Sequence, residues 1–441
     1  MKKLRISLFL GIVFLILSIP VIHKALPIVR DKECYRSFFP KRQFSQRMQR
    51  GPEDWMIEQL NKDFVGIQEI HAESIEKTYA QICDHVGFVP EICHYRIIDN
   101  KLYKFTPKGA PFSDTDTRWE KALKTLLLEA KVDNCDFILA GVDGVPEHYF
   151  PDDFYLTEKE EDQAPILAQA KREKIASHHV VLIPDQLSLC ELWKHAAEEV
   201  LNSGVYWEEK KSSAIWRGGL SDTGIPTDGR FAPHYEETPR FALCRLSLEH
   251  PQEVDAGFCG LDSKKMQEVA QGLGMLGSFL SKKEHLYSKY LPVLDGHMCT
   301  YPGYQWRLLS NSVCLKQESD QVQWFYKALK PYVHYIPVKE DMSDLLEQIQ
   351  WAKNHDQEAQ EIAQRASEFT RKNLMIEDDY FYLHLALREY AKRQVIDFHK
   401  LKAQMKSDSR WRCIQYRKRL ALKKSWEKIK SKAIRSYIDQ K

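Results

Sequence analysis

Residues 289–351 constrain the fold of this 441-residue chain more than any other stretch. Two short apolar runs, at 312–315 and 333–336, flank a segment in which apolar side chains recur at helical spacing over 322–329. Apolar runs this short are typical of buried strands, and two parallel strands need a crossover connection, usually a helix. The stretch therefore predicts a βαβ unit, followed by two helices that start near Asp341 and Asp356. Such units build an open α/β sheet, which binds ligands at the carboxyl ends of its strands.

Patterns upstream predict further strands. Residues 94–103 alternate and are broken at Asp99-Asn100, which predicts a β-hairpin. The apolar runs at 136–140 and 178–183 fit buried strands. A helical pattern ends near Gly204, so we expect a domain boundary at 202–206, before another strand that ends in Arg217 and two glycines.

The two ends of the chain differ in charge and hydropathy from the middle. Residues 6–22 form an apolar run behind Lys2, Lys3 and Arg5, which favours an uncleaved single-pass signal anchor over a cleaved signal peptide. Basic residues on both sides of the run leave its orientation open. Although the net charge is only +2, the chain from Lys392 onward has 17 Lys or Arg against 4 Asp or Glu.

We expect residues 410–441 to form a basic amphipathic helix. Such a helix suits an anionic membrane surface, and a helix packed on the first domain is the alternative. Nucleic acid is not expected as a partner, because the rest of the chain has no nucleic-acid motif. The ten cysteines include no C-x-x-C, so free buried thiols are the expectation.

Two acidic sequences are candidates for the chemistry of the site. Asp143 follows the strand at 136–140, where a carboxylate can take a proton from an acceptor hydroxyl; a simple Asp-Gly turn is the alternative. The D-x-D of Asp114 and Asp116 could hold a divalent cation on a sugar diphosphate. However, Thr117 and Glu120 have capping-box spacing, which favours a helix start here and no metal.

Several separated motifs resemble glycosyltransferase family 90, whose members include eukaryotic protein O-glucosyltransferases, fungal capsule xylosyltransferases and bacterial lipopolysaccharide-modifying enzymes. The resemblance runs from about Tyr95 to Leu374. The sequences that carry it are HYRIIDNKLY, WEEKKSSAIWRGG, KYLPVLDG, the Trp306-Arg307 pair, and LKPYVHYIPV followed by Asp341 and Ser343-Asp344-Leu345. It implies the GT-B type of fold, in which two Rossmann-like domains hold the donor between them.

The resemblance also implies roles for single residues. Asp143, with Pro146 after it, resembles the family's catalytic base. The expected donor-binding residues are Arg217, Gly218, Arg240, Asp295, Gly296 and Arg307. A charge at the start of a solvated helix is the alternative for Arg240, and a salt bridge to Asp295 or Glu318 is the alternative for Arg307. Many animal members carry an arginine where this chain has Leu220.

Together these features predict an inverting, metal-independent glycosyltransferase at a membrane. It would move a sugar from a UDP-sugar to a hydroxyl of a glycan (lipopolysaccharide or capsule) or of a protein. A non-catalytic protein that binds sugar nucleotides, or a scaffold on the same fold, is the alternative. The predicted parts are an anchor helix at 1–25, a stalk and leading helix at 26–75, Rossmann-like domains at 76–204 (acceptor and base) and 205–375 (nucleotide sugar), and helices with a basic tail at 376–441.

Overall fold

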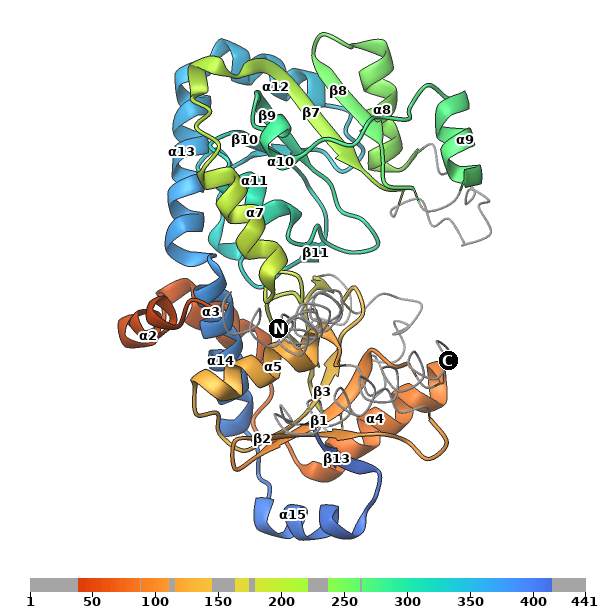
Figure 1. The fold of residues 1–441 in the computed structure, drawn as a ribbon, viewed down its shortest axis with the longest axis vertical. Helices are drawn as coiled ribbons and strands as arrows, with labels where there is room; N and C mark the ends of the chain where they lie inside the picture. Colours follow the sequence, from red (N-terminus) through yellow and green to blue (C-terminus); the bar gives the residue numbers. More distant parts are fainter. Residues whose placement is uncertain are drawn as a thin grey trace, which may run out of the picture. The chain divides into compact units, whose positions relative to one another are not determined.

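Two β-sheets with flanking helices organise the chain (Figure 1). The computed structural model describes residues 39–87, 89–110, 116–144, 163–173, 179–220, 237–261 and 264–414. Residues Lys41–Cys413 form one compact unit. The α/β class predicted from the sequence is therefore confirmed.

The second sheet is parallel throughout. Its five strands have the order β12-β10-β9-β7-β8. They are β7 (Lys211–Gly218), β8 (Val254–Phe258), β9 (Ser288–Val293), β10 (Val313–Gln317) and β12 (Ile336–Val338). The chain adds β8 on one side of β7 and then β9, β10 and β12 on the other, so the topological switch point lies between β7 and β9. In sheets of this doubly wound order the ligand site lies there, outside the carboxyl ends of the strands.

Helices accompany each step of this sheet. They are α8 (Pro239–Glu249), α9 (Lys264–Gly272), α10 (Lys282–His285), α11 (Gly303–Leu309), α12 (Leu345–Asn354) and α13 (Asp356–Asn373). The apolar positions that predicted the last two, including Leu345, Ile349 and Ile362, lie in the core of this sheet.

The crossover at 322–329 is not the predicted helix. It contains the two-residue strand β11 (Gln321–Val322), which pairs with β5 (Lys171–Arg172), and a 3-10 turn at Tyr326–Ala328. Trp324 and Phe325 are consecutive and both are buried, with Trp324 packed 4.2 Å (ring centroids) from Tyr382. A helix would point these neighbours in different directions, so burying both against aromatic partners overrides the helical spacing. The following strand also starts later than predicted, at Ile336.

The first sheet, in the domain predicted to be Rossmann-like, is mixed. Its order is β13-β2-β1-β3-β4-β6, and only β3, β4 and β6 run parallel. The strands are β1 (Ile92–Ile98), β2 (Lys101–Phe105), β3 (Cys135–Ala140), β4 (Ile166–Ala168), β6 (Val180–Leu182) and β13 (Trp411–Cys413). The hairpin β1–β2 is confirmed, and it turns through Asp99 and Asn100, whose φ angles are 52° and 56°.

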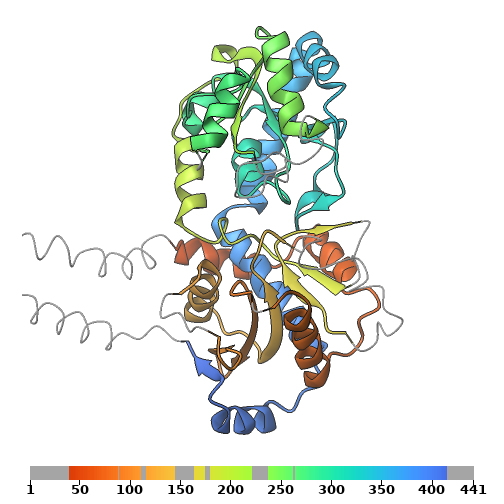
Figure 2. The same ribbon diagram turned by 90° about the vertical axis from the view of Figure 1, so that its right-hand side faces the viewer.

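Helices cover both faces of the first sheet. α4 (Ala72–Val86) packs on β3 from one face and α14 (Ile376–Lys392) from the other (Figure 2). The remaining helices are α2 (Lys41–Arg50), α3 (Asp54–Asp63), α5 (Arg118–Glu129), α7 (Glu191–Leu201) and α15 (Phe398–Ser407). Residues 202–206, where the sequence predicts a domain boundary, connect α7 to a 3-10 turn at Trp207–Glu209.

The start of the predicted basic helix is wrong. Trp411–Cys413 form β13 at the edge of the first sheet, because the Trp411 ring packs 4.8 Å from the His94 ring and 5.3 Å from the Phe105 ring. The rest of that prediction, from residue 415, lies outside the described residues, as does the apolar run at 6–22. None of the helices in the described part of the chain combines the length and apolar composition that a bilayer crossing needs.

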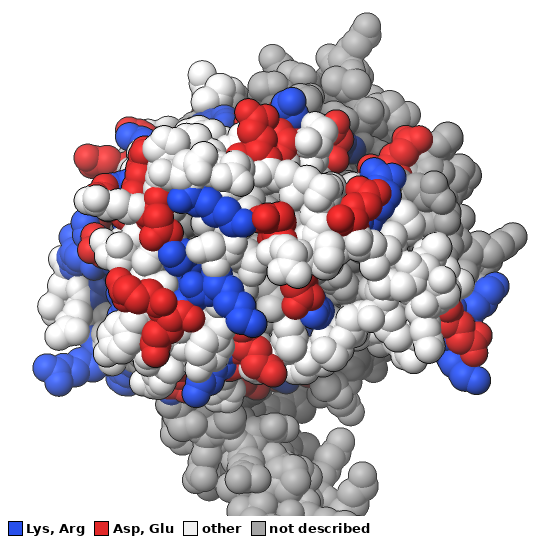
Figure 3. All heavy atoms as spheres, turned by 90° about the horizontal axis from the view of Figure 1, so that it is seen from above, with Lys and Arg blue, Asp and Glu red and all other residues white. Residues whose placement is uncertain are grey.

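Charges of both signs are interspersed on the face shown in Figure 3. Lys and Arg lie beside Asp and Glu, and the described residues on this face form no broad area of one sign. Of the cysteines expected to be free and buried, Cys135 and Cys314 are so, and Cys244 is buried.

Candidate active site

A cavity of about 440 Å³ lies at the switch point of the second sheet. We call it the arginine pocket. Its lining comes from the end of β7, the start of α8, the end of β9 and the helices α10 and α11. The lining residues are Glu199, Trp216, Arg217, Gly218, Arg240, Cys259, Phe279, Leu280, Ser281, Lys282, His285, Leu294, Thr300, Trp306 and Arg307. Four of the six predicted donor-binding residues thus meet in one pocket.

Arg307 is a buried cation that has no carboxylate partner among the described residues. Its side chain is supplied by α11, and the residue is 5% exposed. Nη1 donates to the carbonyl of Gly303 at 3.0 Å, and no carboxylate in the described ranges lies within 4.0 Å of the guanidinium. Nε is buried and has no hydrogen-bond partner among the described residues. Burial, and then repulsion from Arg240, lowers the pKa of Arg307 to about 10. The alternative of a salt bridge to Asp295 or Glu318 is therefore wrong.

Arg240 lies in the first turn of α8, and its guanidinium donates hydrogen bonds to backbone carbonyls of the protein. Nε donates to the carbonyl of Asp295 at 2.9 Å, and Nη1 donates to the carbonyl of Gly219 at 2.9 Å. These bonds fix the ends of β7 and β9 relative to each other beside the pocket. Since Arg240 is 9% exposed, the alternative of a solvated helix charge is wrong.

Arg217 ties strands together at the rim of the pocket. Nη2 pairs with the Asp255 carboxylate at 2.7 Å, and Nε donates to the carbonyl of Ser278 at 3.1 Å. Its charge is thus largely compensated within the protein, in contrast to that of Arg307.

The two glycines after Arg217 differ. A Cβ on Gly218 would collide with the Trp216 indole, whereas one on Gly219 would meet nothing within 4 Å. Gly218 is thus required by packing. Leu220 lies in the hydrophobic core.

His285, which the sequence did not single out, also lies in the arginine pocket. The residue is 4% exposed, and its ring meets the Trp306 ring edge-on at 5.6 Å. Burial, and then the charges of Arg307 and Arg217, lowers the pKa of His285 to about 4. Only the fold brings α10 against α11, so no local pattern could have identified this residue.

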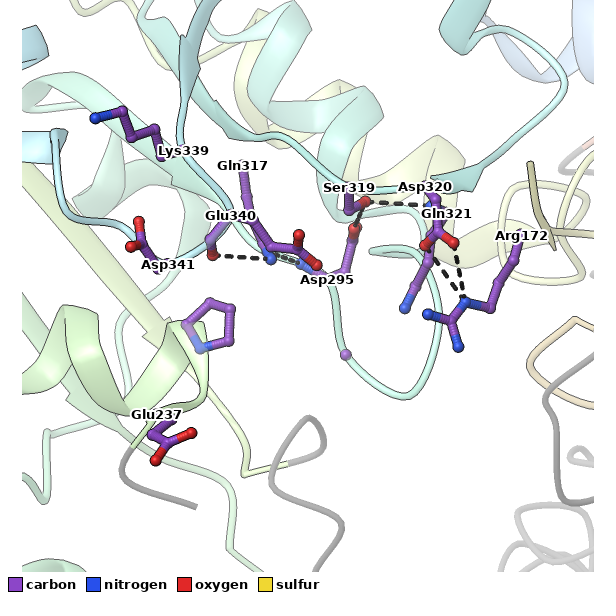
Figure 4. Close-up of a pocket in the computed structure, with 12 residues that line it drawn as sticks. Arg172, Glu237, Asp295, Gln317, Ser319, Asp320, Gln321, Lys339, Glu340 and Asp341 are labelled. Atoms are coloured by element: carbon purple, nitrogen blue, oxygen red, sulfur yellow. Dashed lines mark hydrogen bonds and ion pairs between the residues drawn. The ribbon is translucent and has the colours of Figure 1, made fainter. Parts of the chain in front are cut away.

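The other two predicted donor residues, Asp295 and Gly296, line a second cavity of about 630 Å³ (Figure 4). The Asp295 carboxylate accepts from Ser319 and from Lys316. Asp320, also in this cavity, pairs with Arg172 at 3.2 Å. The structure therefore divides the predicted donor set between two cavities, which the Arg240–Asp295 bond connects.

Asp143 lines neither cavity. It is exposed on the loop after β3, and its carbonyl accepts a hydrogen bond from the Tyr301 hydroxyl at 3.0 Å. Tyr301 follows Thr300, which lines the arginine pocket, so Asp143 lies beside the loop that leads into α11. Pro146 and the neighbouring acids at 147–153 lie outside the described residues.

The D-x-D sequence is only partly described, because Asp114 lies outside the described residues. The capping box of Thr117 and Glu120 at the start of α5 is confirmed. Asp116 forms an ion pair with Lys124 of the same helix. Within the described ranges, no group of three or more His, Cys, Asp or Glu side chains could hold a metal ion.

A buried polar chain positions α11. The Ser188 hydroxyl lies between the Asp185 carboxylate and the amide oxygen of Gln305, and Gln305 Nε2 donates to Asp379 at 3.2 Å. Burial raises the pKa of Asp185 to about 6. Because Gln305 is two residues from Arg307, these hydrogen bonds link the loop after β6, and also α14, to the helix that carries the buried cation.

Comparisons with known proteins show the family of this chain. The family model described as glycosyl transferase family 90 matches residues 84–436. The chain belongs to this family. Human protein O-glucosyltransferase 3 is 29% identical over 343 residues, which are 76% of this chain and 61% of that protein. Protein O-glucosyltransferase 2 of Danio rerio is 34% identical over 44% of this chain and 35% of its own length. Human protein O-glucosyltransferase 1 is 32% identical over 45% and 47%, respectively. The chain thus spans less than two thirds of the length of these relatives.

Proposed function

We propose that this chain is an inverting glycosyltransferase that binds a UDP-sugar in the arginine pocket and transfers the sugar to an acceptor hydroxyl. The observation that carries the proposal is Arg307, buried at the switch point with no carboxylate partner among the described residues. A buried cation is costly unless it is paired, and a diphosphate supplies the missing charge. Family membership supports the transfer reaction.

The proposed reaction is a single displacement. The acceptor oxygen attacks the anomeric carbon while the bond from that carbon to the diphosphate oxygen breaks. Asp143 takes the acceptor proton, and UDP leaves with its charge stabilised by Arg307, Arg240 and Arg217. In this proposal the first sheet contributes the base and the second sheet the cations, in the GT-B arrangement, and no metal ion takes part.

The proposed acceptor is a protein hydroxyl. This choice is supported by the relatives that are named protein O-glucosyltransferases. Lipopolysaccharide and capsule glycans are the other candidates from the resemblance. The apolar run at 6–22 supports attachment to a membrane through a single-pass anchor.

The test is hydrolysis of a panel of UDP-sugars by the purified full-length chain, with and without EDTA. We expect turnover of one sugar that survives EDTA and falls at least a hundredfold in Asp143→Asn. Asp133→Asn is the matched control, because Asp133 is also exposed but lies at the amino end of the same strand. Loss of turnover with EDTA would contradict the metal-independent mechanism. UDP binding without turnover, with acceptors present, would favour the non-catalytic alternative.

A further inference from the structure

Two side chains that line the arginine pocket each have a buried nitrogen without a hydrogen-bond partner among the described residues. The two nitrogens are Nε of Arg307 and Nε2 of His285, and both residues line the pocket. Both are more than nine-tenths buried, at 5% and 4% exposure. Buried polar groups are nearly always hydrogen-bonded, so two such atoms in side chains that line one pocket point to a ligand that satisfies them.

The tautomer of His285 follows from its other nitrogen. Nδ1 lies 2.8 Å from the carbonyl oxygen of Ser281. A carbonyl can only accept, so Nδ1 carries the proton and Nε2 presents a lone pair. A capping box between Ser281 and Glu284 fixes this turn, and Lys283 N donates to Glu199 of α7 at 3.1 Å. The imidazole is therefore oriented before any ligand arrives.

The surroundings keep this imidazole neutral. Arg307 of α11 and Arg217 of β7 face it with positive charge, which with burial lowers the pKa of His285 to about 4. Glu284 of the same turn acts in the opposite direction and more weakly, while Glu199 of α7 and Lys282 also line the pocket. At neutral pH, Nε2 is thus an acceptor, and its partner must bring its own hydrogen.

We propose that Nε2 of His285 accepts a hydrogen bond from a hydroxyl group of the bound nucleotide sugar. The inference rests on the proposed function, and it adds a residue that recognises the donor. Phosphate oxygens suit the guanidinium of Arg307, but an ionised diphosphate has no hydrogen to give to Nε2. A hydroxyl can donate to Nε2 and can also accept from Nε of Arg307. The hydroxyl belongs to the ribose or to the transferred sugar.

Two amide variants separate this role from a structural one. Gln at 285 can reach the Nε2 position with its amide oxygen but cannot keep the Nδ1 bond to Ser281. Asn at 285 can keep the bond to Ser281 but falls short of the Nε2 position. We expect His285→Gln to retain most of the affinity for the UDP-sugar and His285→Asn to lose about tenfold to a hundredfold, since a buried partner is left unsatisfied.

The measurement is calorimetric titration of the full-length chain with the UDP-sugar, UDP and 2′-deoxy-UDP. If His285→Asn loses the same affinity for UDP as for the UDP-sugar, and little more for 2′-deoxy-UDP, the hydroxyl that donates to Nε2 belongs to the ribose. A loss confined to the UDP-sugar assigns the transferred sugar. His355→Asn is the matched control, because His355 makes the same Nδ1 contact, to Trp351 at 2.8 Å, outside the pocket. We expect it to bind like the wild type.

Three results would overturn the proposal while leaving the proposed function intact. The first is that His285→Asn binds the UDP-sugar as tightly as the wild type, and the second is that His285→Asn binds it more tightly than His285→Gln does. The third is proton uptake on binding at pH 7, measured from the binding enthalpy in buffers of different ionisation enthalpy, since uptake would mean that an imidazolium donates to phosphate instead. A wild-type chain that binds no UDP-sugar would refute the proposed function itself, and this inference with it.

Discussion

At the scale of single residues, Arg307 shows a conflict between folding and function. Its guanidinium is removed from water, yet the described protein supplies only carbonyl and aromatic contacts, including Trp306 at 4.3 Å. We predict that Arg307→Met raises the free energy of unfolding of the ligand-free protein by about 1 kcal/mol, because it removes an unpaired buried charge. The same change should lower turnover at least a hundredfold. Urea unfolding beside UDP-sugar turnover tests both. A large loss of stability would mean that Arg307 has a structural partner.

Asp185 gives a prediction about pH. Its folded pKa of about 6 exceeds the ordinary value of 3.8, so the folded protein binds more protons than the unfolded chain between these values. The contribution of Asp185 to the free energy of unfolding is therefore fully present below about pH 4 and is lost as the pH rises through about 6. A neutral Asp185 can donate to Ser188, whose hydroxyl then donates to Gln305. Asn mimics that state, so Asp185→Asn should be more stable than the wild type at pH 7.5 by about 2 kcal/mol. In urea unfolding between pH 4 and 8, the free energy of unfolding of Asp185→Asn should depend less steeply on pH than that of the wild type. An unchanged dependence on pH would contradict this account.

At the scale of elements, the question at the start of α5 is whether its acidic residues cap the helix or bind a metal ion. Asp116 pairs with Lys124, and the capping box of Thr117 and Glu120 uses the neighbouring donors. We predict that Asp116→Asn leaves turnover within about twofold of the wild type. Thr117→Ala should lower the free energy of unfolding by about 1 kcal/mol. Turnover with added Mn²⁺ or Mg²⁺ is the decisive measurement, because metal-dependent turnover that disappears in Asp116→Asn would favour the D-x-D.

The edge strand β13 gives a second prediction at this scale. The guanidinium of Arg96 lies 3.9 Å from the centroid of the Trp411 ring, which also packs on His94 and Phe105. We expect Trp411→Ala to cost about 2 kcal/mol of stability. Hydrogen exchange should speed up most in β2, the neighbour of β13. Exchange that rises equally in both sheets would argue for a global effect instead.

The elements that the sequence predicted correctly are those whose cause is local. The hairpin turn at Asp99-Asn100, the capping box of α5 and the buried strand β3 each depend on a few adjacent residues. The helix expected at 322–329 failed because aromatic partners far away in the chain, such as Tyr382, decide the backbone there. The same limit applies to the site. Arg217 and Arg307 were found from motifs, but His285 depends on a contact between α10 and the pocket that no spacing reports.

At the scale of the whole molecule, the strands of the two sheets come from differently arranged parts of the sequence. The strands of the second sheet all lie between residues 211 and 338. The first sheet takes five strands from residues 92–182, and then β13 from 411–413 and the covering helix α14 from 376–392. The polar chain from Asp185 through Gln305 to Asp379 therefore joins segments from the beginning, middle and end of the fold.

This arrangement has a consequence for synthesis on the ribosome. Domains usually fold in the order in which they are made. Here the segment made first cannot complete its sheet until residue 413 has emerged, so β2 keeps an open edge while the second sheet already has all of its strands. An open strand edge invites pairing with other chains. The half of the protein that is translated earlier is therefore the one that matures later, and the one that depends on protection while the chain is still growing.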